Sequence, residues 1–284
     1  MGVQKVNVVD NKSEMQSFVR ALLNDVQAFQ YMLENNWFES DIVRIGAEQE
    51  MCLVDKKSYK PACINMDVLE QLTDAPWCVT ELARFNLETN LSPREFVGTC
   101  LSEMEAENNE YLAKIQEVLD KYDAVIALCG ILPTLRKPDL EMHNLTPKDR
   151  YYALMAAIQK HLLGTAFELR VEGIDELLVR HDSPLLEACN TSFQVHLQVA
   201  PKEFVKMYNI AQTLAAPVIS ISANSPLVFG RRLWHETRIA LFQQSLDTRT
   251  TSDHMRERLP RVNFGSGWLR GDITEIYKED ISRF

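Results

Sequence analysis

Three stretches of the chain, residues 42–54, 83–91 and 190–199, alternate between apolar residues and residues that bind cations or form hydrogen bonds. Because the side chains of a β-strand point alternately to its two faces, each stretch predicts a strand with one apolar and one polar face. Paired in one sheet, the three strands would bury their apolar face under helices. The opposite face would then gather these polar residues: Arg44, Glu48, Glu50, Arg84, Asn86, Glu88, Asn90, Asn190, Ser192, Gln194, His196 and Gln198.

Helical patterns separate these strands along the chain. Ser102 starts a capping-box pattern that predicts a helix to about residue 122, and residues 233–246 predict another helix. Long apolar runs of the kind found in buried parallel sheets are scarce. The sequence therefore predicts an α+β fold with a mostly antiparallel sheet, helices on one face and a polar site on the other.

Composition excludes several classes of protein. The 40 acidic and 30 basic residues give a net charge of −10, which argues against general nucleic-acid binding. No apolar run reaches the roughly 18 residues of a membrane span, and residues 1–12 lack a signal-peptide core. The 6 cysteines include no Cys-x-x-Cys pair, which favours reduced thiols in a cytoplasmic protein.

Glu48 and Glu50 lie two residues apart on a predicted strand, so their carboxylates project from the same face. Three interpretations are open. Arg44 or Arg84 neutralises the acids on a solvated outer face, or the acids bind a divalent cation together with Glu88, or they form a pair for acid–base chemistry. His196 on the third strand is an additional metal ligand or an orienting group.

The basic candidates lie later in the chain. Arg231 and Arg232 follow Gly230, and Arg238 comes six residues further on, so these arginines are candidates for binding phosphate. The alternative is a set of surface ion pairs at the end of a helix. Arg150 and Tyr151 open a predicted helix and form a weaker candidate for binding a carboxylate.

Four motifs, in order along residues 42–240, resemble the glutamate–cysteine ligase family, in particular its carboxylate–amine ligase branch. Gly46 to Met51 resembles the Gly-x-Glu-x-Glu strand of that family, and Phe85 to Asn90, followed by Pro93, resembles its second acidic strand. Phe193 to Leu197 resembles the His-Val-His strand, with Gln194 in the place of the first histidine. Ser222 to Pro226, with Gly230 and Arg238, resembles the Ser-x-x-Ser-Pro segment and the arginine after it.

The resemblance implies a glutamine-synthetase-like fold and ATP- and Mg²⁺-dependent amide formation. In such a reaction a carboxylate such as the γ-carboxylate of glutamate is phosphorylated, and an amine such as that of cysteine attacks the acyl phosphate. Among the residues that match the family's motifs, the resemblance assigns Glu48, Glu50, Glu88 and His196 to metal, and Arg238 to phosphate binding and catalysis. Arg231 and Arg232 are further candidates for binding the ATP phosphates. The candidates for binding substrate are Arg150, Tyr151, Asn190 and Gln194.

The family also has a C-terminal arginine and a Glu-x-Arg strand, which we do not find before Phe284. We therefore expect a helical segment over residues 1–40 and a ligase-like catalytic domain over residues 41–284 that lacks the family's C-terminal part. Two other functions are open: a non-catalytic domain that binds a nucleotide or amino acid and regulates a partner, and a two-carboxylate hydrolase. The expected partners are small molecules rather than nucleic acid or membrane, and a homo-oligomer is left open.

Overall fold

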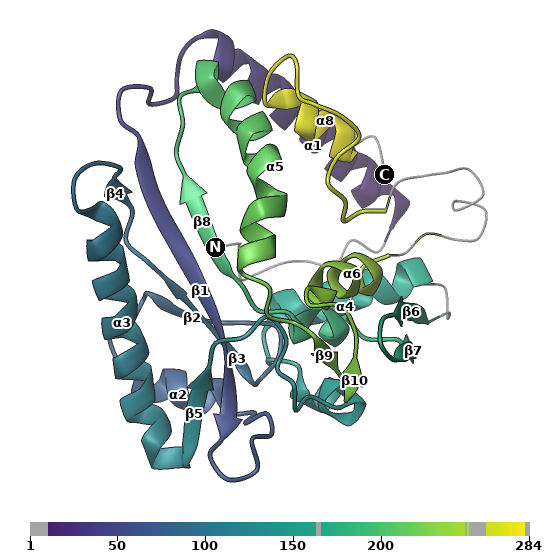
Figure 1. Cartoon of the computed structure of the whole chain (residues 1–284). Helices are drawn as coiled ribbons and strands as arrows, with labels where there is room; N and C mark the ends of the chain where they lie inside the picture. Colours follow the sequence, from purple (N-terminus) through teal and green to yellow (C-terminus); the bar gives the residue numbers. More distant parts are fainter. Residues whose placement is uncertain (1–10, 163–165, 248, 250–259, 282–284) are drawn as a thin grey trace.

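A long central strand organises the fold. The computed structural model describes residues 11–162, 166–247, 249 and 260–281. Strand β1 (Arg44–Asp55) runs through the middle of a six-stranded antiparallel sheet, and Figure 1 shows that it spans much of the height of the molecule.

Each edge of β1 pairs with two shorter strands. β3 (Asn86–Asn90) and β4 (Arg94–Glu95) lie along one edge, and β8 (Phe193–Leu197) and β5 (Ala124–Ala127) lie along the other. β2 (Cys78–Thr80) pairs with β3. Every one of these pairings is antiparallel, so the prediction of an α+β fold with an antiparallel sheet is confirmed.

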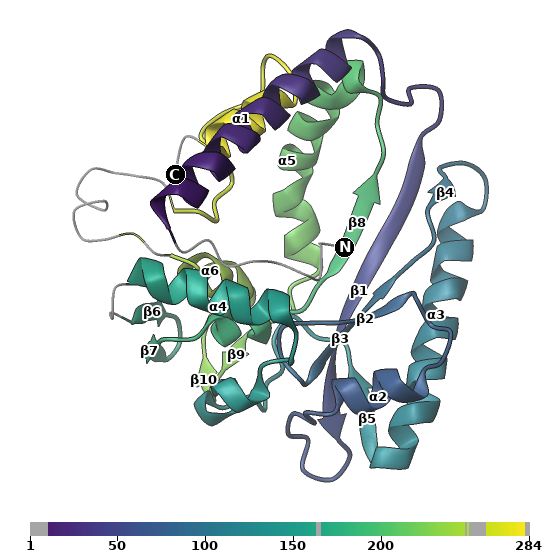
Figure 2. The ribbon, with the colours of Figure 1, turned by 180° about the vertical axis from the view of Figure 1, so that it is seen from behind.

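Helices α2 (Asn65–Gln71) and α3 (Cys100–Leu119) cover one face of the sheet, and Figure 2 shows the two helices side by side. Met51, Leu53 and Leu87 from the sheet are buried in one hydrophobic cluster with Val68 of α2 and Ile115 of α3. Burial of each such side chain stabilises the fold by about 1.5–3 kcal/mol. The apolar half of the β1 and β3 alternation therefore fixes which face of these strands the helices cover.

A larger hydrophobic cluster joins the sheet to a second group of elements. It contains Cys52 and Phe85 from the sheet region together with Leu169, Leu186 and Leu241. The elements of this group are α4 (Asp149–Leu162), β6 (Phe167–Glu172), β7 (Glu176–His181), β9 (Leu227–Val228), β10 (Arg231–Arg232) and α6 (Thr237–Ser245). Short 3₁₀ helices connect the elements: η1 (Asp120–Tyr122), η2 (Lys137–Leu140), η3 (Met142–Asn144), η4 (Pro184–Cys189) and η5 (Pro201–Glu203).

Three helices, α1 (Lys12–Glu34), α5 (Phe204–Ile221) and α8 (Thr274–Ile281), form the upper part of the molecule in Figure 1. The ring of Phe29 in α1 meets Tyr277 of α8 edge-on, with ring centroids 5.3 Å apart. No residue of α1 or α5 is buried. Among the helices of the described residues, none combines the length and apolar composition that crossing a membrane requires. The predicted division of the chain at residue 40 stays a prediction.

Two predicted helices begin at other residues. α3 begins at Cys100 with Thr99 as its N-cap residue, before the predicted cap at Ser102. α6 begins at Thr237 rather than at Leu233. The backbone N–H of Leu233 donates to the carbonyl of Pro226, at a distance of 2.8 Å, and that of Ser225 donates to the carbonyl of His235 at 2.9 Å. These bonds extend the segment before α6, so the helix starts later than its apolar pattern suggests.

The apolar face of β8 is not covered as the alternation predicts. Phe193, Val195 and Leu197 are 47%, 57% and 39% exposed. Their partners on β1 include Ile45 and Ala47, which are buried in a cluster that contains α3 residues. Helix α3 packs against β1 and β5. It therefore buries apolar side chains of the central strand, while those of β8 stay exposed.

Asn65 connects α2 to the loop between β2 and β3. Its fully buried side-chain nitrogen donates to the carbonyls of Ala83 and Asn86, both at 3.2 Å, and to Thr146 Oγ1 at 2.9 Å. We expect Asn65→Ala to lower the free energy of unfolding by about 2–3 kcal/mol, because buried acceptors lose their donor. Urea denaturation followed by circular dichroism measures this, with exposed Asn109→Ala on α3 as the control. Equal stability of the two variants would contradict the expectation.

Candidate metal centre

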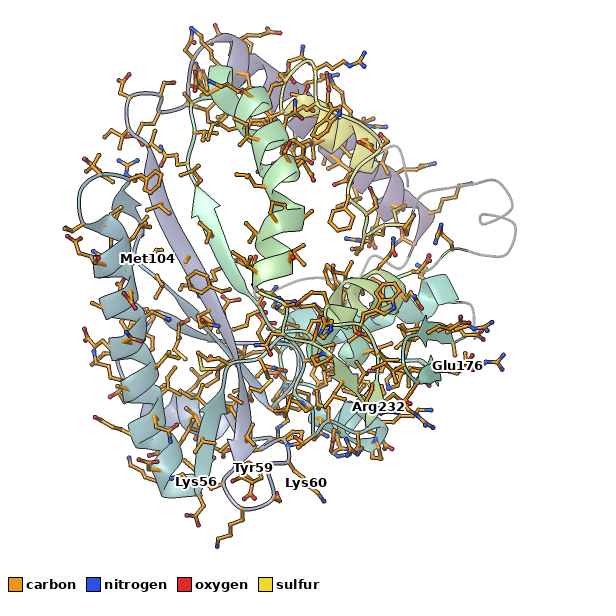
Figure 3. The ribbon with its side chains drawn as sticks, in the orientation of Figure 1. Lys56, Tyr59, Lys60, Met104, Glu176 and Arg232 are labelled. Atoms are coloured by element: carbon orange, nitrogen blue, oxygen red, sulfur yellow. The ribbon has the colours of Figure 1, made fainter. Side chains whose placement is uncertain are left out.

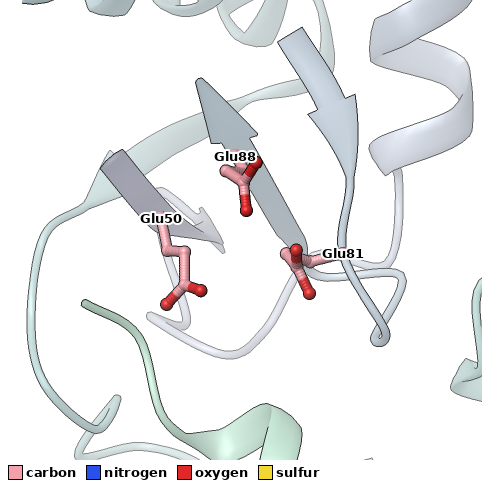
Figure 4. Close-up of side chains that lie close together, drawn as sticks. All are labelled: Glu50, Glu81 and Glu88. Carbon is pink, nitrogen blue, oxygen red and sulfur yellow. The ribbon is translucent and has the colours of Figure 1, made fainter. Parts of the chain in front are cut away.

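Three carboxylates from separate segments meet beside the sheet. Glu50 on β1 and Glu88 on β3 are direct partners in the antiparallel register. Glu81 reaches them from the bend after β2, and one oxygen from each residue lies within 4.8 Å of the others. Figure 4 shows the three side chains around a shared space. The β1–β3 register places Glu50 opposite Glu88, and the β2–β3 pairing brings Glu81 to them.

Burial and like charge perturb the acids of this cluster. Burial, followed by the nearby charges of Glu50 and Glu88, raises the pKa of Glu81 to about 9. Burial also raises the pKa of Glu50, although hydrogen bonds from Ser192 act in the opposite direction. A fourth acid, Glu187 on η4, has its pKa raised to about 7 by burial and by the charge of Glu50. Without a cation, burial and like charge therefore favour the protonated form of these acids over the ionised form.

No lysine or arginine in the described part of the chain forms a salt bridge with Glu50, Glu81 or Glu88. Arg44, one of the two arginines predicted to neutralise the acids, forms an ion pair with Glu39 instead. Arg84, the other, has a buried Nε that finds no hydrogen-bond partner among the residues the structure describes. The solvated-face interpretation therefore lacks the arginine contacts that it predicts.

The donor set of the cluster fits a hard divalent cation. Mg²⁺ and Ca²⁺ bind carboxylate oxygens, and Mg²⁺ is usually held by one or two carboxylates with water and phosphate completing its coordination. Glu50, Glu81 and Glu88 supply only oxygen, and a cation among them would stabilise the ionised form of Glu81, whose pKa is raised by burial and by the charges of Glu50 and Glu88. The described residues thus provide a chemically suitable place for such an ion.

Glu48 and His196 form a neighbouring pair. His196 Nε2 lies 3.6 Å from Glu48 Oε2, where β8 pairs with β1. Both residues line a cavity of about 240 Å³ together with Asn90. Of the four residues predicted to bind metal, the structure therefore brings Glu50 and Glu88 into one cluster with Glu81. It places Glu48 and His196 together in a second group, because Glu48 lies two residues before Glu50 on β1.

β8 and the segment before it carry two polar side chains with amide groups. Gln194 Nε2 lies 3.5 Å from Glu50 Oε1. The side-chain oxygen and nitrogen of Asn190 are buried without a hydrogen-bond partner in the described structure. An unpaired buried amide is costly in free energy, which makes Asn190 a candidate for binding a ligand.

Tyr151 lies behind the bend that carries Glu81. Its hydroxyl donates to the carbonyl of Thr80 at 2.9 Å, and burial followed by the charge of Glu81 raises its pKa. Arg150 lies over the Tyr151 ring, with its guanidinium carbon 5.2 Å from the centroid. Tyr151 thus contacts the backbone that positions Glu81, and Arg150 contacts Tyr151.

The guanidinium of Arg238 makes four hydrogen bonds. Its guanidinium donates to both carboxylate oxygens of Glu236, at 2.5 and 3.1 Å, and to the carbonyls of Thr191 and Ser222 at 3.3 and 3.1 Å. Gly130 lies directly beside it, since a Cβ there would be 3.0 Å from Arg238 Nη1. Arg238 therefore links the start of α6 to the segment before β8 and to the end of α5.

Arg231 and Arg232 lie elsewhere. They form β10 of a two-stranded hairpin with β9, and both are exposed. Arg232 makes a bidentate contact with Asp175, with nitrogen–oxygen distances of 2.9 and 3.0 Å, and Figure 3 shows it at the edge of the molecule that also carries Glu176. Of the three arginines predicted to bind phosphate, Arg232 therefore forms the surface ion pair of the alternative interpretation.

Glu81 was missed by the sequence analysis because it lies outside the three alternating stretches. The signal that would have found it is the short β-prone run at residues 78–80 before it. Paired antiparallel with residues 87–89, this run delivers the next residue to the side where Glu88 projects.

Comparison with known proteins identifies the family to which the chain belongs. A comparison with curated proteins gave no match. Residues 44–266 match the family described as Glutamate-cysteine ligase family 2, a match that includes Glu48, Glu50, Glu81, Glu88 and His196. The match covers well over half of the chain, and the chain belongs to Glutamate-cysteine ligase family 2.

Proposed function

We propose that this protein is an ATP- and Mg²⁺-dependent carboxylate–amine ligase that forms a γ-glutamyl-type amide through an acyl phosphate. Family membership supports a ligase that joins carbon to nitrogen. The observation that carries the finer proposal is the convergence of Glu50, Glu81 and Glu88, which form no salt bridge with any lysine or arginine that the structure describes. We further propose that the six-stranded sheet is the cradle of a glutamine-synthetase-like fold.

In this proposal Glu50, Glu81 and Glu88 hold Mg²⁺, and Glu48 with His196 extends the ligand set toward the adjacent cavity. Bound Mg²⁺ would offset the charge of the transferring phosphoryl group, which needs positioning and cations more than it needs a nucleophilic side chain. The three acids fit this role, since their only possible ligand atoms are oxygens and no described lysine or arginine forms a salt bridge with them.

Two amides, one on β8 and one in the segment before it, suit substrate recognition. Asn190 has unused hydrogen-bonding capacity, and Gln194 lies beside Glu50. We propose that they bind the polar groups of glutamate or a comparable acid, with an amine such as cysteine as the second substrate. Arg238 acts by holding the segment before β8 in place, because all of its donor nitrogens are already engaged. The 6 free cysteines are consistent with the reducing cytoplasm in which we place the protein.

The purified chain tests this proposal in an assay for ADP release with ATP, Mg²⁺, glutamate and cysteine. We expect release that requires both the acid and the amine and that falls strongly in Glu88→Gln. The exposed α3 variant Glu105→Gln is the matched control. Binding of ATP and Mg²⁺ without turnover would support the non-catalytic alternative, and metal-independent turnover would support the two-carboxylate hydrolase.

A further inference from the structure

Ser192 directs its polar groups toward Glu50. Its backbone N–H donates to Glu50 Oε2 at 2.7 Å, and its hydroxyl donates to the same oxygen at 3.0 Å. Its carbonyl accepts the backbone N–H of Glu50, also at 3.0 Å. One residue therefore fixes both the backbone and one carboxylate oxygen of a cluster acid.

The position of Ser192 makes these donors rigid. β5 and β8 pair with different parts of the same edge of β1, and Ser192 lies between these two pairings. The preceding residue, Thr191, is tied to the end of β5, since its backbone N–H donates to the Gly130 carbonyl at 3.0 Å and its hydroxyl donates to the Cys129 carbonyl. Ser192 is therefore anchored from both sides, and its hydroxyl can hold Glu50 in a single orientation.

These bonds leave the two oxygens of Glu50 unequal. Oε2 accepts two hydrogen bonds from Ser192, whereas Oε1 accepts one longer bond from Gln194 at 3.5 Å. Groups that fix the orientation of a ligating carboxylate contribute to metal affinity although they do not touch the metal. We propose that Ser192 is a positioning residue that holds Glu50 in the orientation needed to bind a divalent cation. This inference rests on the proposed function, because it assumes a cation among Glu50, Glu81 and Glu88.

The test measures the dissociation constant of Mn²⁺, used as a spectroscopic substitute for Mg²⁺, by electron paramagnetic resonance. Ser192→Ala keeps the backbone donor and loses the hydroxyl, so we expect Mn²⁺ to bind about tenfold more weakly. Ser192→Thr keeps a hydroxyl and is expected to bind Mn²⁺ within about twofold of the wild type. Ser192→Gly repeats the loss of the hydroxyl in a second background, and Ser102→Ala on the exposed first turn of α3 is the control.

Thermal unfolding of each metal-free variant separates positioning from a purely structural role. Weaker Mn²⁺ binding in both Ser192→Ala and Ser192→Gly, with restoration in Ser192→Thr, supports the proposal. Unchanged Mn²⁺ binding in a folded Ser192→Ala or Ser192→Gly overturns it, whether or not the melting temperature falls. If the wild-type protein binds no Mn²⁺, the proposed function itself fails, and that outcome is distinct because it appears before any substitution is made.

Discussion

Glu81→Gln is expected to stabilise the metal-free protein and, at the same time, to weaken its binding of divalent cations. The substitution replaces a buried acid, whose pKa is raised to about 9, with a neutral side chain of similar shape. We expect the free energy of unfolding at pH 8 to rise by at least about 1.4 kcal/mol, the equivalent of one pKa unit. Loss of one of three carboxylate ligands is expected to weaken Mg²⁺ binding by about 100-fold or more.

The same residue predicts how stability depends on pH. The pKa of Glu81 is about 9 in the folded protein and 4.5 as its ordinary value, so the folded state binds this proton more tightly than the unfolded state does. The stabilisation of the folded state that comes from this tighter proton binding is fully present below pH 4.5 and is lost as pH rises through 9. Urea titrations of the metal-free wild type are expected to show decreasing stability over this range, with a smaller decrease in Glu81→Gln.

Glu117→Gln, on the exposed surface of α3, is the matched control for both measurements. It is expected to leave the pH dependence and the Mg²⁺ affinity unchanged. A Glu81→Gln variant that is less stable than the wild type at pH 8 and still binds Mg²⁺ normally would show that Glu81 has a different partner.

Arg238→Ala is expected to destabilise the fold more than any other single loss of an ion pair described above. The arginine side chain is 22% exposed and its partner Glu236 12%, so the substitution leaves a largely buried carboxylate without its cation. It also removes the donors to the carbonyls of Thr191 and Ser222. We expect a loss of about 3 kcal/mol in the free energy of unfolding, measured by urea denaturation.

The double variant Glu236→Ala/Arg238→Ala separates the pair from the rest of the network. Because the unpaired carboxylate is absent, we expect it to be less destabilised than the sum of the two single variants. Arg180→Ala provides the exposed comparison. Its pair with Glu168 has side chains 77% and 50% exposed, so a loss below about 1 kcal/mol is expected. Equal losses in Arg238→Ala and Arg180→Ala would contradict the account.

Period-2 alternation predicted the strands that matter most to the site. It located β1, β3 and β8 within a few residues of their ends, because successive side chains of a strand point to opposite faces and so alternate in polarity. The alternation does not predict which strands pair or in which register. That Glu50 lies opposite Glu88 is therefore known only from the structure. Glu81 lies on a bend, where no periodic pattern marks it.

Local patterns were less informative where tertiary contacts compete with them. The run Gly230-Arg231-Arg232 suggests phosphate binding, but Asp175 from the β6–β7 connection binds the guanidinium of Arg232. The apolar residues of β8 alternate as a half-buried strand does, yet α3 packs on the strands beside it. In both cases the environment of the side chain depends on which segment, distant in sequence, packs against it. A local sequence pattern does not contain that information.

Mn²⁺ titration of the wild type and of Glu88→Gln, followed by electron paramagnetic resonance, tests most directly whether Glu50, Glu81 and Glu88 form a cation site. We predict a bound Mn²⁺ signal in the wild type that is strengthened by ATP and lost in Glu88→Gln. A wild-type protein that binds no Mn²⁺, or a Glu88→Gln variant that binds it equally well, would contradict the assignment of this cluster as the metal centre.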